Sequence, residues 1–385
     1  QYAKHVDQKA NYLLGQPISF SCENDDYAAE VKKVLGMRFM RTLKSAGVEC
    51  LNAGISWLYP YYNKNGELAF RVFPGYEIMP FWADAAHTEL DSALRLYPVE
   101  VYYGTEKKIV KKVDLFTLEG VTTYIFENGV LTPDTEKQAY VKVKDSKGNE
   151  QPLNWERFPL IPIKYNPKEV PLIRRGRSLQ DAINLLQSDF VNNMEEDVRN
   201  TVLVLKNYDG QDLGEFRRNL TTYGAIKVRT VEGTDGGVDS LEISVNSENY
   251  KTVLELLKKA LIENLRSYDA KDDRLSGTPN QMNIQSMYCD IDLDANAMET
   301  ELQAAFEEIL WFVNTYLANT GKGSYESEDI TVIFNRDILI NESEAIDNCS
   351  KSVGIISDET IVAMHPWVDD PAAELERLEK QEEEA

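Results

Sequence analysis

The chain has 385 residues, 43% of them hydrophobic, and a formal net charge of −23 at pH 7. This length and apolar content indicate two or more compact units rather than a disordered chain, and no apolar run approaches the roughly 20 residues that span a bilayer. Because nonspecific nucleic-acid binding depends on neutralising phosphates with Lys and Arg, so acidic a chain is not expected to bind nucleic acid tightly.

The first 177 residues are expected to combine two helices with an antiparallel meander. Apolar residues at helical spacing predict a helix that closes at Gly15 and a single helix striped from Val31 to Leu43, with a short extended piece opened by Pro17 between them. Strands are expected on either side of the turn signal Asn63–Gly66. The predicted strands are 55–62, 67–73, 98–103, 109–118, 121–126 and 139–143.

A pair of long helices with a small insertion between them is expected next. Five prolines between Pro152 and Pro171 predict an extended connector, which is the expected boundary. The apolar period then predicts a helix over 178–200 and a returning helix over 247–269. Short apolar runs at 202–205, 225–228 and 241–245 are separated by several glycines. They predict a small group of β-strands between these two helices.

The last part of the chain is expected to begin with a loop and then become mostly helical. Residues 271–286, KDDRLSGTPNQMNIQS, are polar and lack any period, so we predict a loop there. A third helix is predicted with Asp294 as its N-cap and an end near Gly321. Beyond it we predict a strand and three short helices. The strand is at 330–334, and the helices begin at the capping box Asn341-x-x-Glu344, at Ser357 and at Asp370-Pro371.

Several stretches, in this order, resemble the portal proteins of tailed bacteriophages, in the long-tailed branch. They are YAKHVDQKANYLLGQPISF, GISWLYPYYNKNGELAFRVFPGYEIMPFW, FPLIPIKYNP, LQSDFVNNMEEDVRNTVLVLKNYDG, DITVIFNRDILINESEAIDN and VGIISDETIV. The resemblance implies an α+β portal fold with a β-rich wing, a two-helix stem, a small α/β clip, and a long helix under the wing that leads to a truncated helical crown. Its parts would be wing 1–177, stem 178–200 and 247–269, clip 201–246, tunnel loop 270–292, long helix and second part of the wing 293–345, and start of the crown 346–385.

The resemblance also implies a function and partners. Portal proteins form a dodecameric ring at one capsid vertex, and double-stranded DNA passes transiently through its channel. The expected partners are the terminase large subunit, a head-completion or adaptor protein, the scaffold protein and the major capsid protein. The expected location is the virion, and the host bacterial cytoplasm during assembly. No enzymatic activity, cofactor or membrane association is implied.

Three groups of side chains are candidate sites on this interpretation. The tunnel loop would touch DNA, the clip would dock partners, and the stem would contact neighbouring subunits. The loop residues are Lys271, Arg274, Ser276, Thr278, Asn280 and Asn283; the clip residues are Asp212, Arg217 and Arg218; the stem residues are Arg174, Arg175, Arg177, Phe190 and Leu257.

An alternative function is a calcium-responsive binding module around residues 290–301. Asp290, Asp292, Asp294 and Glu301 occupy positions one, three, five and twelve of an EF-hand loop, although its sixth position is Ala295 instead of glycine. A further alternative is a carbohydrate-active enzyme that uses the aromatic hairpin around Trp57 with some pair of carboxylates.

Other chemistry is poorly represented in the sequence. No phosphate-binding GxxxxGK[ST] motif is present, so a packaging motor would need an external ATPase. The four cysteines lack CxxC spacing, which favours a reducing compartment and argues against structural zinc. The three histidines are too dispersed to form a catalytic set. The sequence begins at Gln1 and ends in an acidic stretch, so we expect a fragment trimmed at both ends.

Overall fold

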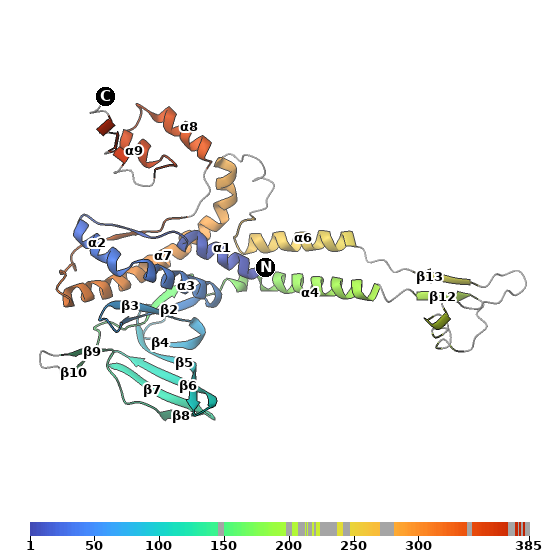
Figure 1. The fold of residues 1–385 in the computed structure, drawn as a ribbon, viewed down its shortest axis with the longest axis horizontal. Helices are drawn as coiled ribbons and strands as arrows, with labels where there is room; N and C mark the ends of the chain where they lie inside the picture. Colours follow the sequence, from blue (N-terminus) through green and yellow to red (C-terminus); the bar gives the residue numbers. More distant parts are fainter. Residues whose placement is uncertain are drawn as a thin grey trace, which may run out of the picture. The chain divides into compact units, whose positions relative to one another are not determined.

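The computed structural model describes residues 1–144, 150–197, 202–206, 237–241, 247–269, 281–336 and 341–368, with a few further positions between 212 and 223 and between 374 and 381. The chain divides into two compact units (Figure 1). Unit 1 contains residues 1–176 and 262–385, and unit 2 contains residues 177–261.

The N-terminal helices of unit 1 pack by their apolar faces. α1 (Tyr2–Leu14) ends before Gly15 as predicted. The predicted single helix from Val31 to Leu43 is wrong, because two helices cover this region, α2 (Asp25–Val34) and α3 (Met37–Ala53). The break is local: Leu35 leaves the helical conformation, and Gly36 is extended and serves as the N-cap of α3.

A three-stranded antiparallel sheet follows α3 in the order β11 (Ile161–Lys164), β2 (Ile55–Tyr62) and β3 (Leu68–Phe73). β2 has the predicted bounds. The turn forms as expected, since the Asn63 amide donates to the Glu67 carbonyl at 2.9 Å. Gly54 connects α3 to β2 with φ +89°, and a Cβ there would lie 1.9 Å from the carbonyl oxygen of Glu169, so only glycine fits.

The predicted meander is confirmed for the strands at 98–103, 109–118 and 121–126, which belong to a five-stranded antiparallel sheet in sequential order, whereas the predicted strand at 139–143 lies in a separate strand pair. The strands of the five-stranded sheet are β4 (Ile78–Trp82), β5 (Leu90–Tyr103), β6 (Glu106–Thr117), β7 (Gly120–Glu127) and β8 (Val130–Pro133), and the 3-10 turn η1 (Gly75–Glu77) precedes β4. Trp57 and Phe73 from the smaller sheet share one buried core with Ala93 and Phe116 of the meander, so the two sheets form a single body.

Two short strand pairs complete the β structure of unit 1 in the described residues. β1 (Ser19–Ser21) pairs with β14 (Thr331–Ile333), which joins the N-terminal region to the segment after the third long helix. β9 (Val141–Lys144) and β10 (Glu150–Leu153) form a separate two-stranded pair.

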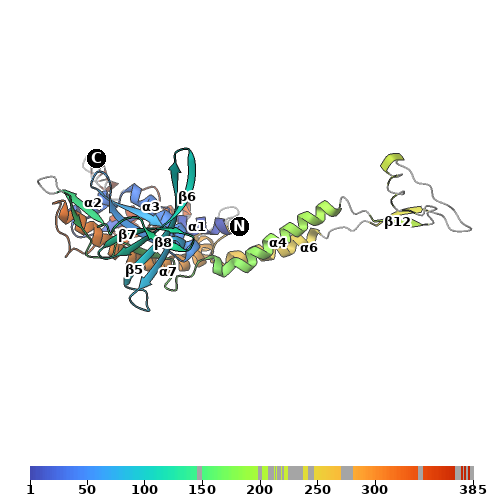
Figure 2. The ribbon, with the colours of Figure 1, turned by 90° about the horizontal axis from the view of Figure 1, so that it is seen from below.

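Unit 2 contains most of the predicted helical pair. α4 (Ile173–Asp197) and α6 (Ser247–Asn264) lie side by side in two perpendicular views (Figures 1 and 2), and the rings of Phe190 and Tyr250 meet with their centroids 5.0 Å apart. β12 (Val202–Lys206) pairs with β13 (Gly237–Leu241), so the first strand of the insertion is confirmed. Of the predicted strand at 241–245 only Leu241, the last residue of β13, is described, and the predicted strand at 225–228 lies outside the described residues.

The third long helix, α7 (Gln281–Asn319), starts earlier than predicted. The loop prediction is wrong over 281–292, and Asp294 is not an N-cap but a residue inside the helix. Ile284, Met287 and Ile291 are buried and extend the apolar face by almost three turns. α8 (Glu342–Ser352) and α9 (Asp358–Ala363) begin at their predicted caps, Asn341 and Ser357.

Candidate functional site

A buried ion cluster surrounds Asp294 in the middle of α7. Its side chain is only 4% exposed. The Lys9 ammonium of α1 donates to Asp294 Oδ2 at 2.7 Å, and the Tyr165 hydroxyl donates to the same oxygen at 2.6 Å. Arg175, in the first turn of α4, donates to Oδ1 at 2.7 Å. One carboxylate therefore holds α1, the segment after β11 and the start of α4 against α7.

Lys9 extends this cluster to the end of the helical pair. Its ammonium also donates to the carbonyl oxygen of Arg266, just beyond α6, at 2.9 Å. Arg266 has φ +50°, a left-handed conformation that is uncommon outside glycine. Arg175 lies in the first turn of α4, and Arg266 lies just beyond the end of α6. Both residues therefore belong to one polar network in unit 1.

The cluster keeps Asp294 ionised and Tyr165 protonated. Burial on its own would raise the pKa of Asp294, but the charge and hydrogen bond of Lys9, with hydrogen bonds from Tyr165 and Arg175, outweigh burial and hold that pKa below its ordinary value. Burial and the negative charge of Asp294 raise the pKa of Tyr165, so its hydroxyl remains a donor.

A second cluster lies about half a turn away on α7. Arg336, which follows β14, donates to Asp292, Asn296 and Glu299, the last at 2.6 Å. The Tyr12 hydroxyl of α1 donates to Asp292 at 3.0 Å. These contacts attach α7 to α1 a second time, and to the returning segment that carries β14. Their geometry suits a rigid joint rather than a catalytic site.

The calcium-loop prediction is wrong. Residues 290–301 lie entirely within α7, so they form continuous helix and not the curved loop that wraps a calcium ion. Asp294 is bound to Lys9 and Arg175, and Asp292 to Arg336. Within the described ranges, no group of three or more His, Cys, Asp or Glu side chains is arranged to hold a metal ion.

Most of the predicted channel residues lie outside the described residues. These are Lys271, Arg274, Ser276, Thr278 and Asn280. Asn283 lies in the first turn of α7 and is exposed, so it belongs to a helix and not to a loop.

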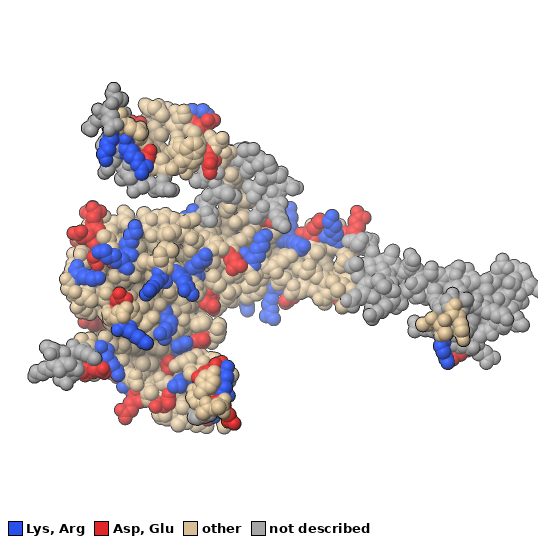
Figure 3. Space-filling view, in the orientation of Figure 1, with Lys and Arg blue, Asp and Glu red and all other residues tan. Residues whose placement is uncertain are grey.

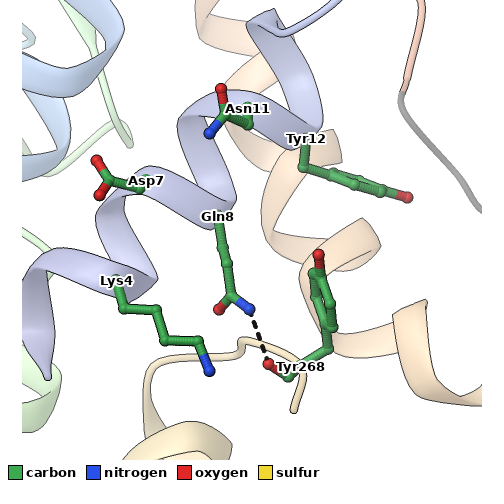
Figure 4. Close-up of a pocket in the computed structure, with 6 residues that line it drawn as sticks. All are labelled: Lys4, Asp7, Gln8, Asn11, Tyr12 and Tyr268. Carbon is green, nitrogen blue, oxygen red and sulfur yellow. Dashed lines mark hydrogen bonds between the residues drawn. The ribbon is translucent and has the colours of Figure 1, made fainter. Parts of the chain in front are cut away.

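A polar pocket of about 400 Å³ lies beside Tyr268, close to where the expected loop begins (Figure 4). Three successive turns of α1 line it through Lys4, Gln8 and Asn11, and Gln8 Nε2 donates to the Tyr268 carbonyl at 3.1 Å. This hydrogen bond fastens the chain to α1 immediately before residues 270–280.

The clip candidates are only partly described. Asp212 and Arg218 are exposed, and Arg217 lies outside the described residues. Asp212 Oδ1 accepts a hydrogen bond from the Gly214 amide at 2.8 Å, so this carboxylate shapes its own turn.

The stem candidates divide into two sets. Arg174 and Arg177 are exposed and accessible to a neighbour, although Arg177 already lies 3.7 Å from the Asp181 carboxylate on the same helix. Arg175 binds Asp294, and the half-buried Phe190 contacts Tyr250, so both already have contacts within one chain. Leu257 is half-buried.

Sequence reasoning missed four exposed apolar side chains on the same two helices. Leu185 and Val191 on α4 are 64% and 54% exposed, and Val253 and Leu256 on α6 are 45% and 63% exposed. The signal in the sequence was their apolar character, and only the structure shows that these side chains are exposed and that no apolar neighbour among the described residues covers them.

No helix in the described part of the chain has the length and apolar content needed to cross a membrane. A β-rich body, a helical pair with an insertion, and a long helix that follows them are the elements expected of a phage portal protein.

Comparison with known proteins agrees with this class. The family described as "Phage portal protein, SPP1 Gp6-like" matches residues 2–385. The portal protein of Bacillus phage SPP1 is 30% identical over 380 residues, covering 98% of this chain and 74% of that protein. The portal protein of Clostridium phage phiCD119 is 27% identical over 385 residues, covering 97% of this chain and 81% of that protein. The chain therefore belongs to the SPP1 Gp6-like family of phage portal proteins.

Proposed function

We propose that this chain assembles as a dodecameric ring at the unique vertex of a phage capsid, where double-stranded DNA enters during packaging and leaves during ejection. Support comes from the family match across residues 2–385 and from two relatives that are both portal proteins. On this proposal the protein is structural, needs no cofactor, and belongs to the virion after assembly in the host cytoplasm.

The observation that carries the ring proposal is the set of exposed apolar side chains on the helical pair. Leu185, Val191, Val253 and Leu256 are exposed in the single chain. Fully burying one such side chain contributes about 1.5–3 kcal/mol, so a single copy leaves substantial stabilisation unused. A neighbouring helical pair would cover them, and stable obligate interfaces bury on the order of 2,000 Å² or more. Arg174 and Arg177 would lie at the edge of that contact.

The charge of the chain suits a conduit rather than a tight DNA-binding surface. A net charge of −23 disfavours stable phosphate contacts, and screening confines its repulsion to about 8 Å at physiological salt. Residues 270–283, with Lys271 and Arg274 among small polar side chains, are proposed to touch DNA briefly. Packaging then depends on an external ATPase.

Partner docking is proposed at the insertion between the stem helices. Asp212 and Arg218 are exposed there, so both are accessible to a partner. The terminase large subunit would dock during packaging and a head-completion or adaptor protein afterwards, while the scaffold and major capsid proteins would contact the wing.

The ring is tested by mass photometry with negative-stain imaging at low and high salt. Wild-type protein should give rings with a hole of duplex width. The double variant Leu185→Glu with Leu256→Glu should give single copies with a wild-type circular-dichroism spectrum, because it places charges at exposed positions and leaves the buried side chains unchanged. The matched control, Gln187→Glu with Lys259→Glu, adds charge at exposed polar positions and should still form rings.

Either of two results contradicts this proposal. Wild-type protein that remains a single copy at every salt concentration removes the ring. Rings that form equally well with both leucines replaced show that these exposed leucines are not part of the subunit contact.

A further inference from the structure

A groove of about 1020 Å³ lies in unit 1 between α3 and the β2–β3 hairpin. One wall is a stripe of α3 that includes Arg38 and Arg41, one turn apart on the same helix face. The other wall is β3, where all residues from Leu68 to Val72 line the groove. Phe39 and Phe70 also line it and meet edge to face, with ring centroids 5.1 Å apart, so part of the lining is apolar.

The groove is basic in a strongly acidic protein. Five cationic side chains line it against the single carboxylate of Glu67, whereas the whole chain has a net charge of −23. Lys and Arg side chains gather over α2, α3 and the β2–β3 hairpin on the face shown in Figure 3. The cations that line the groove are Lys33, Arg38, Arg41, Arg71 and Lys322.

Three of these cations have no counter-ion among the residues that the structure describes. Lys33 and Lys322 share Glu30 at one end of the groove. Within the described part of the chain, no carboxylate pairs with Arg38, Arg41 or Arg71, and Arg71 lies over the Tyr61 ring at 4.8 Å. Unpaired arginines around a groove are suited to bind carboxylates.

The wall formed by β3 is an open sheet edge. β3 is the outer strand of the sheet β11-β2-β3 in the described residues. Because the Asn63 amide bonds the Glu67 carbonyl, the antiparallel alternation directs the backbone N–H and C=O groups of Leu68, Phe70 and Val72 away from β2. Side chains alternate between faces, so a groove that touches five consecutive residues runs along the edge itself. An open edge is a template for an added strand.

We propose that this groove binds an extended acidic peptide segment of a partner protein, which adds as a strand to β3. The peptide backbone pairs with the outward groups of Leu68, Phe70 and Val72. Alternate carboxylates on the α3 face of the added strand bind Arg38 and Arg41, and a carboxylate on the opposite face binds Arg71. An apolar side chain on the α3 face packs toward Phe39 and Phe70. A DNA duplex is less suited to this surface, because phosphates would use the arginines but neither the apolar lining nor the strand edge.

The test selects peptides with the full-length chain. Random 12-residue peptides displayed on phage are panned on wild-type protein, with removal of those that bind Arg38→Glu/Arg41→Glu. Retained sequences should be enriched in Asp or Glu at alternate positions. A labelled retained peptide should bind the double variant and Arg71→Glu at least tenfold more weakly in fluorescence anisotropy. Lys32→Glu/Lys168→Glu, which reverses two exposed charges that do not line the groove, should bind like wild type.

A second measurement separates strand addition from simple charge attraction. Methylating alternate backbone nitrogens of the peptide should abolish binding in one register and spare it in the other. Equal binding in both registers overturns the proposal, as does a retained set without acidic enrichment or unchanged affinity for the arginine variants. The proposal is also overturned if a labelled 20-base-pair DNA duplex binds through these arginines while no peptide binds. It is overturned as well if two copies of the chain pair through these arginines.

Discussion

Replacing Asp294 with Asn tests whether the buried ion cluster holds the body together. Asn has the same size, but it leaves the Lys9 ammonium without a counter-charge, and that side chain is only 4% exposed. Removing one partner of a buried pair costs about 3–5 kcal/mol, so this is the expected loss of unfolding free energy. Asp290→Asn on the same helix is the control. Its side chain is exposed, so a change within about 0.5 kcal/mol is expected.

Urea unfolding followed by tryptophan fluorescence measures both variants, because Trp57, Trp82 and Trp155 all lie in unit 1. A double-mutant cycle with Lys9→Met should show a coupling of at least about 1.5 kcal/mol, since the two side chains are in direct contact. Additive effects in this cycle, or an Asp294→Asn variant as stable as Asp290→Asn, would refute the reasoning.

The pH dependence of this cluster has a defined sign. The pKa of Asp294 in the folded protein lies below its ordinary value of 3.8. The stabilisation that the ionised carboxylate gives to the fold is therefore fully present above pH 3.8 and is lost as the pH falls through the folded pKa. Asp294→Asn should therefore reduce stability at pH 7 much more than at pH 2–3. An equal loss at both pH values would show that the carboxylate charge does not matter.

Three further predictions concern other parts of the chain. Burial and nearby lysines lower the pKa of His5 to about 4, so the unfolded chain binds a proton at this histidine before the folded chain does. The stability of the fold should therefore decrease as the pH falls from about 6.5 to 4. His5→Gln should flatten that part of a plot of melting temperature against pH, and parallel plots for the variant and the wild type would contradict this. Gly54→Ala should lower the free energy of unfolding, measured in urea, by several kcal/mol. Gly66 also has a positive φ, but a Cβ there would meet open space, so Gly66→Ala should lower it by only about 1–2 kcal/mol. Equal losses for the two variants would disprove the backbone clash at Gly54. Reversing Arg217 and Arg218 to Glu should weaken terminase docking in a pull-down while ring size stays constant, and undiminished docking would exclude these arginines.

The sequence by itself determined the elements that depend on short-range interactions. The bounds of β2 followed from its run of aromatic and apolar residues and the turn at Asn63. The starts of α8 and α9 followed from Asn341 and Ser357, because an N-cap bonds to an amide only three residues away. The antiparallel meander was also predictable, since consecutive strands joined by tight turns pair with each other.

The family resemblance came from longer stretches, and its match across residues 2–385 confirmed it. By contrast, the spacing of apolar residues did not predict the break between α2 and α3. The apolar spacing continues through Leu35 and Gly36, and only the backbone conformation separates the two helices.

Only the tertiary structure decided the role of Asp294 and the start of α7. An acidic residue before an apolar stripe is equally consistent with an N-cap, a calcium ligand or a buried ion. The choice depended on Lys9, Tyr165 and Arg175, which lie 119 to 285 residues away in the chain. Burying a charge is tolerated only where the fold supplies opposite charges and hydrogen bonds, and partners so distant leave no signal in the local pattern.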